Sequence, residues 1–204
     1  MAGTPIDLQL LNACAALLLL LSFSMLSQRR IVSLVNLLAM QGGLLFVATL
    51  LLAWRTGQSH LYLSAALTLL LKVILLPWLL HRMIRRLEVY WDTEPLLNTA
   101  GTMLAGVVTV VFAFGLAQPI AALASTAMRN AIGIALAVIL LAFITMITRR
   151  KAMSQVVGFL SMENGLFFGA MSATYGMPMI VELGVALDVL VAMLVLGVFF
   201  FQIR

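Results

Sequence analysis

The sequence has 204 residues, of which 64% are hydrophobic and only 9% are charged. Soluble domains carry about 25% charged residues, so this composition excludes a soluble fold and indicates a chain whose surface faces lipid. The 12 Lys and Arg outnumber the 7 Asp and Glu, but they fall in short clusters between apolar segments, which is typical of membrane topology rather than of nucleic-acid binding.

Seven apolar segments are long enough to cross a bilayer, since a transmembrane helix needs about 20 mostly apolar residues. The sequence therefore predicts an all-α, polytopic membrane protein with about seven transmembrane helices. The first segment has Asp7 and no cation before it, so we expect a retained helix rather than a cleaved signal peptide. In chain order, the segments are residues 8–27, 31–53, 61–80, 96–117, 124–147, 153–172 and 179–203.

The cations alternate between the two ends of the predicted helices. They follow the first, third and fifth helices and end the chain, whereas the other connections hold only Arg55 and Arg129. By the positive-inside rule, this pattern places the N-terminus outside and the C-terminus in the cytoplasm. The connection at residues 81–95 mixes charged and aromatic residues, which predicts an interfacial segment that could dock a soluble partner.

Two parts of the chain resemble each other weakly. Residues 40–46 share four identities in seven with residues 162–168, and residues 66–68 similarly match residues 186–188. Helices one to three and five to seven are therefore predicted to be parallel three-helix repeats, a repeat type found in transport proteins. This divides the chain into an N-terminal repeat with its interfacial segment at 1–95, a fourth helix and connector at 96–123, and a C-terminal repeat at 124–204.

Four ionisable residues lie inside the predicted spans, namely Lys72, Glu163, Glu182 and Asp188. A charge at the bilayer centre costs at least about 2.5–3.5 kcal/mol on insertion scales, so it usually has a partner or a role. Counted along the helices, Lys72, Glu163 and Asp188 lie near the midplane, and Glu182 lies near the outer boundary. Groups at a common depth can pass protons along the membrane. We therefore predict a proton relay through Lys72, Glu163 and Asp188, with Glu182 as a secondary candidate.

Static pairing between helices is the alternative role for these charges. One cation faces three carboxylates, so pairing alone would leave at least one buried acid without a cation. Gln155 and Asn164 could hydrogen-bond across helices or hold water, and Pro77 is expected to kink the third helix. Close helix packing is expected at Gly165 and Gly169. The numbers of Cys and His, one and two, are too small for an iron–sulfur cluster, a zinc site or a bis-His haem within this chain.

The polar motifs resemble those of a known family, the membrane component E of hydrogenase-4 and formate hydrogenlyase-type complexes. The matching segments are residues 71–77 around Lys72, residues 162–165 around Glu163, and residues 181–188, which hold Glu182 and Asp188. The last three predicted helices also resemble the three-helix K component of respiratory complex I and the C component of Mrp antiporters. On this resemblance, Glu163 and Asp188 occupy two intramembrane carboxylate positions in successive helices.

The resemblance implies a non-catalytic, multi-pass subunit of a complex I-like hydrogenase in a bacterial or archaeal cytoplasmic (inner) membrane. The implied partners are antiporter-like membrane subunits, a hydrogenase-anchoring membrane subunit and, through the complex, soluble hydrogenase and iron–sulfur subunits. No cofactor is implied in this chain, because the iron–sulfur clusters and nickel–iron site would lie in those partners. Two alternatives stay open: the equivalent subunit of an Mrp-type cation/proton antiporter or quinone-reducing complex, and a stand-alone small transporter.

Overall fold

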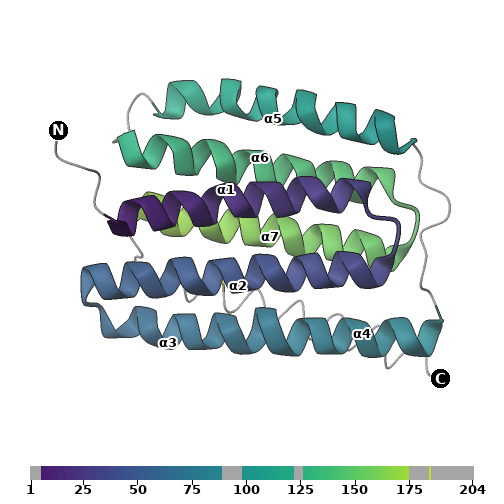
Figure 1. Cartoon of the computed structure of the whole chain (residues 1–204), viewed down its shortest axis with the longest axis horizontal. Coiled ribbons are helices and arrows are strands. Elements are labelled where there is room, and N and C mark those ends of the chain that lie inside the picture. The colour runs from purple at the N-terminus through teal and green to yellow at the C-terminus, as the bar shows by residue number, and fades with distance from the viewer. Residues whose placement is uncertain (1–5, 89–97, 122–125, 175–183, 185–204) are drawn as a thin grey trace.

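The computed structural model describes residues 6–88, 98–121, 126–174 and 184, and the regular secondary structure within them is helical. It contains six helical spans that are long and apolar enough to cross a membrane. They run side by side in alternating directions (Figure 1). The spans are α1 (Ile6–Ser27), α2 (Ile31–Thr56), α3 (Ser59–Thr68) continuing through η1 (Leu69–Leu75) into α4 (Leu76–Leu87), α5 (Thr99–Ala121), α6 (Thr126–Thr148) and α7 (Ala152–Thr174).

These spans correspond to the first six predicted helices. The seventh predicted helix, at 179–203, lies outside the described residues except for Gly184, and Glu182 and Asp188 lie outside them as well. The third helix was predicted to end near residue 80, but it continues to Leu87. It can continue because Met83 and Ile84 stay buried in the bundle while Arg82, Arg85 and Arg86 are exposed.

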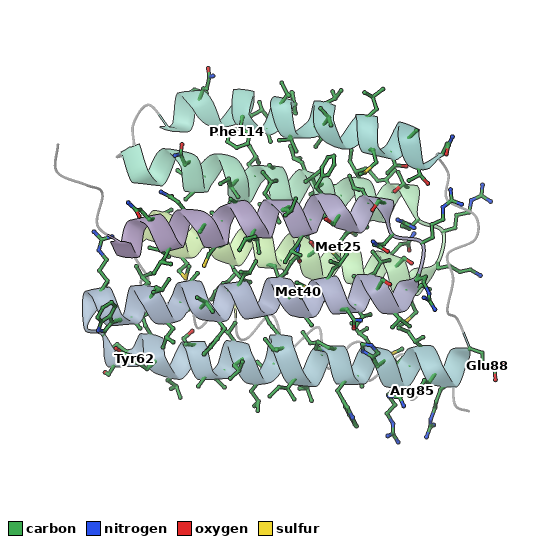
Figure 2. All side chains as sticks on the ribbon, viewed as in Figure 1. Met25, Met40, Tyr62, Arg85, Glu88 and Phe114 are labelled. Carbon is green, nitrogen blue, oxygen red and sulfur yellow. The ribbon has the colours of Figure 1, made fainter. Side chains whose placement is uncertain are left out.

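The alternating helix directions bring three basic clusters to one end of the bundle. The clusters are Arg29 and Arg30 after α1, Arg85 and Arg86 in the last turn of α4, and the residues around Arg149 after α6. These three helices all run the same way. Figure 2 labels Arg85 at this end, which we call the basic end. The opposite end, the Gly57 end, holds the turn between α2 and α3. Gly57 adopts a left-handed φ of 67°, and its N–H donates to the Ala53 carbonyl at 2.9 Å, so a glycine suits this helix end.

The last two described helices pack closely through glycines, as the sequence predicted. A Cβ atom on Gly165 would lie 2.9 Å from Val138 Cγ1 and 3.2 Å from the Ile139 backbone nitrogen. One on Gly169 would lie 2.9 Å from Ala135 Cβ. Small residues let the backbones of α6 and α7 approach, which is how membrane helices gain packing energy without a hydrophobic driving force between them.

The third span departs from regular α-helix before Pro77 rather than at it. Residues Leu69–Leu75 form a π-helix, and the Leu76 N–H donates to the Leu71 carbonyl, five residues back. Pro77 has no N–H to donate, and the wider turns that precede it accommodate that loss. The sequence predicted a kink just beyond Lys72, whereas the irregular turn contains Lys72 itself. Such π segments are frequent at functional sites.

Candidate functional site: a buried polar layer

The structure pairs two of the predicted relay residues. The Lys72 Nζ lies 3.1 Å from Glu163 Oε1, and these side chains are 4% and 3% exposed. Lys72 is midway along the span Ser59–Arg86, and Glu163 is midway along the span Ala152–Ala173. The two charges are therefore at a common depth near the middle of the bundle.

A line of hydrogen bonds extends from this ion pair across two further helices. Lys72 Nζ also donates to Asn164 Oδ1 at 2.9 Å, and Asn164 Nδ2 donates to Gln41 Oε1 at 3.3 Å. Gln41 Nε2 donates to Ser22 Oγ at 2.7 Å, and the Ser22 hydroxyl donates to the Leu18 carbonyl at 2.8 Å. We call Ser22, Gln41, Lys72, Glu163 and Asn164 the polar layer; it joins α1, α2, η1 and α7.

The polar layer separates two apolar clusters. Along each of the four spans, the polar-layer residues lie between buried apolar residues nearer the Gly57 end and buried apolar residues nearer the basic end. The cluster on the basic side is Met25, Ile31, Leu34, Val35, Leu38, Leu76, Leu79, Leu80, Met83, Ile84, Met153, Val157 and Leu160. The cluster on the other side is Cys14, Ala15, Leu18, Leu45, Ala48, Leu52, Ala53, Leu61, Ala135, Val138, Phe167, Phe168 and Met171.

Two neighbours fix the position of Lys72. A Cβ on Gly42 would lie 2.9 Å from Lys72 Cβ and 3.1 Å from the Lys72 carbonyl oxygen, so only glycine lets η1 approach α2 this closely. The Phe167 ring centroid lies 5.5 Å from Lys72 Nζ, a cation–π distance. Amide oxygen, aromatic face and carboxylate all favour the charged ammonium, which offsets part of the cost of burying it.

A small cavity borders Lys72 on its basic side. Lys72, Asn164, Leu38, Leu76 and Leu160 line it, and it has about 10 Å³ of room for the centre of a water molecule. That space is close to the minimum for one ordered water, which needs polar partners such as the ammonium and the amide here. The ammonium of Lys72 and the carboxylate of Glu163 are an acid and a base at hydrogen-bond distance, which is the geometry that a proton transfer between them would require.

Three of the polar layer's residues were not predicted as site residues. For Asn164, the sequence allowed either a hydrogen bond to another helix or a contact with water. The structure shows that it bonds both Lys72 and Gln41. The sequence did point to Gln41, because the alignment of the two predicted repeats places it opposite Glu163. Nothing in the sequence pointed to Ser22. Gln155 lies apart, since its Nε2 donates to the Arg149 carbonyl at 3.0 Å. Within the described ranges, no three His, Cys, Asp or Glu side chains gather to hold a metal ion.

Comparison with known proteins identifies a relative in Mycobacterium tuberculosis (strain ATCC 25618 / H37Rv). The uncharacterized protein Rv0085 is 37% identical over 196 residues, which are 96% of this chain and 89% of the relative. The chain belongs to the Rv0085 family. The match runs through all four helices of the polar layer, so the site lies within the shared region.

The chain also has a more distant similarity to a component of hydrogenase-4. Hydrogenase-4 component E of Escherichia coli (strain K12) is 27% identical over 152 residues, as is hydrogenase-4 component E of Shigella flexneri. The match covers 74% of this chain and 66% of those proteins. No family model matches the sequence, and no solved structure matches it.

Proposed function

We propose that this chain is a non-catalytic membrane subunit of a complex I-like, hydrogenase-4-type assembly, and that Lys72, Glu163 and Asp188 belong to its proton-transfer chain. The observation that carries the proposal is the buried Lys72–Glu163 pair, 3.1 Å apart in the middle of the spans. The similarity to hydrogenase-4 component E supports the kind of complex. In this arrangement, redox chemistry in partner subunits drives ion translocation through a row of charges near the membrane midplane.

The paired acid and base suit such a chain because their protonation is coupled. In a low-dielectric site, a charge that enters or leaves nearby changes the balance between the ion pair and its neutral form. A partner subunit that moves a charge towards Glu163 would therefore push the proton onward. Asp188 continues the chain in the predicted seventh helix, and Glu182 is its secondary member near the outer face.

We also propose a membrane orientation and a set of partner subunits for this chain. The basic end faces the cytoplasm and the Gly57 end faces outward, following the positive-inside rule. Antiporter-like and hydrogenase-anchoring membrane subunits flank this chain. The iron–sulfur clusters and the nickel–iron site lie in the soluble partners.

A double variant separates transport from static pairing. In Lys72→Met and Glu163→Gln, one buried charge loses its counter-charge, which destabilises proteins by about 3–5 kcal/mol. Replacing both, as Lys72→Met/Glu163→Leu, often costs little stability because no buried charge is left. We expect the double variant to assemble and to evolve hydrogen from reduced methyl viologen. Its proton translocation, followed by a pH-sensitive dye in inverted membrane vesicles, should fall at least tenfold.

Glu88→Gln is the matched control. Glu88 is an exposed carboxylate at the end of α4, and its loss should leave translocation unchanged. If the double variant also translocates protons at the normal rate, the pair only holds η1 to α7 and the relay proposal fails.

Purification tests the kind of assembly. A hydrogenase-4-type subunit should co-purify with iron–sulfur proteins and antiporter-like subunits in fixed stoichiometry. An antiporter subunit would co-purify without the iron–sulfur proteins, and a stand-alone transporter would be stable as its own oligomer; either result would reject the hydrogenase assignment.

A further inference from the structure

Ser64 and Thr68 precede Lys72 at intervals of four residues on the α3–η1 span, so all three lie on one face of it. Both hydroxyl residues are buried, at 6% and 1% exposure. Figure 2 labels Tyr62, two residues before Ser64, near the Gly57 end of the span. A polar stripe thus leads from that end towards the ion pair.

The two hydroxyl groups differ from several other buried hydroxyls of the bundle and share their lack of a partner with Ser154, near the basic end. Ser22, Thr49 and Thr145 each donate to the carbonyl four residues earlier, at 2.8–3.0 Å. Among the described residues, Ser64 Oγ and Thr68 Oγ1 are buried and have no hydrogen-bond partner. A buried hydroxyl without a partner is unfavourable, and the usual remedy is an ordered water.

The spacing of the stripe fits single water molecules. Four residues of helix rise by about 6 Å, so a water about 2.8 Å from each neighbour bridges one hydroxyl to the next. Two such steps join Ser64 to Lys72. Ser59 and His60, at the start of α3, are exposed, so the stripe begins close to solvent.

On the other side, the described surroundings of Lys72 are mostly apolar. Beyond Lys72, the same span continues with Leu76, Leu79 and Leu80, which belong to the apolar cluster on the basic side. The small cavity at Lys72 ends against Leu38, Leu76 and Leu160 of that cluster. The described surroundings of Lys72 therefore differ in polarity along the span, with hydroxyls on one side and leucines on the other.

We propose that Ser64 and Thr68 line a single-file water path from the Gly57 end to Lys72. Along it, a proton enters from water, each bridging water or hydroxyl accepts one proton and passes one on, and the last proton binds the neutral Lys72–Glu163 site. The role in proton transfer rests on the function proposed above. The water path itself does not, so the two can fail separately.

Accessibility to Ag⁺ tests the path directly. Ag⁺ is a small cation that moves through water and binds thiols. Ser64→Cys and Thr68→Cys are made in a Cys14→Ala background, because Cys14 is the sole cysteine of the chain. Leu63→Cys is the lipid-facing control, at 67% exposure, and Leu79→Cys is the control on the basic side. After exposure of the intact complex to Ag⁺, the chain is denatured, alkylated with N-ethylmaleimide and weighed by mass spectrometry.

We expect Ag⁺ to protect positions 64 and 68 at least tenfold faster than positions 63 and 79. Equal rates at the four positions would overturn the water path. A second measurement uses near-isosteric changes: Thr68→Val should lower proton translocation several-fold, and Thr68→Ser should retain it. Normal translocation in Thr68→Val would contradict the role of the path in proton transfer. If positions 64 and 68 are protected but the Lys72→Met/Glu163→Leu variant translocates normally, the path stands and the relay function fails.

Discussion

Asn164 connects the ion pair to the rest of the polar layer. Its carbonyl oxygen accepts a hydrogen bond from Lys72, and its NH₂ group donates to Gln41. A leucine of similar size would fill the space but would leave the Gln41 oxygen and one Lys72 proton without these bonds. Buried groups that lose a partner cost more than the lost bond itself contributes.

Asn164→Leu should therefore lower the stability of the protein by about 1–3 kcal/mol. The measurement is thermal unfolding of the purified complex in detergent, read as the melting temperature of this chain. Gln155→Leu is the matched control, because Gln155 is exposed and bonds one local carbonyl. A melting temperature equal to that of the Gln155→Leu variant would show that the Asn164 bonds do not stabilise the layer.

The close contact between α2 and η1 depends on one glycine of an adjacent pair. A Cβ on Gly42 would meet both the side chain and the backbone of Lys72 within 3.2 Å, whereas one on Gly43 would meet nothing within 4 Å. Backbone atoms cannot turn aside as a flexible side chain can. An added methyl group at residue 42 must therefore push the two helices apart.

Gly42→Ala should destabilise the protein by about 1–3 kcal/mol through overpacking and should displace Lys72 from Glu163. Gly43→Ala should be neutral or slightly stabilising, because alanine favours helix over glycine. Both effects are measured by thermal unfolding together with proton translocation in vesicles. Matching losses in the two variants would contradict the close approach of α2 to η1.

The collection of basic residues at one end gives the bundle a sidedness. Each cluster lies at the end of a helix, and these helices run the same way, so the alternating directions alone are enough to gather the charges. By the positive-inside rule, this is the end that we propose to face the cytoplasm.

Two glutamines in opposite turns test this orientation. In the Cys14→Ala background, Gln58→Cys at the Gly57 end should react with a membrane-impermeant maleimide on intact cells. Gln28→Cys, in the turn between α1 and α2 at the basic end, should react only after the cells are opened. Each variant is the control for the other, and the reverse labelling pattern would invert the proposed topology.

Much of the architecture could be predicted from the sequence because hydropathy sets the spans independently of how they pack. Lys72 and Glu163 could be singled out for the same reason, as rare charges in apolar segments. Their 3.1 Å contact could not, because it depends on the rotation of each helix and on the π turn around Lys72. Ser22 gave no signal, since a serine that donates to its own helix is common; only its bond from Gln41 places it in the layer.

The hydrogen bonds that leave Lys72 towards α1 have a single direction. At every step the donor lies nearer to Lys72, from Lys72 to Asn164, to Gln41, to Ser22 and finally to the Leu18 carbonyl. A peptide oxygen has no proton to pass on, and amide groups do not readily exchange theirs. In the proposed relay, this branch would hold the ammonium in place without giving protons a path into α1. In the relay proposed above, the proton would then move onward through Glu163 rather than into α1.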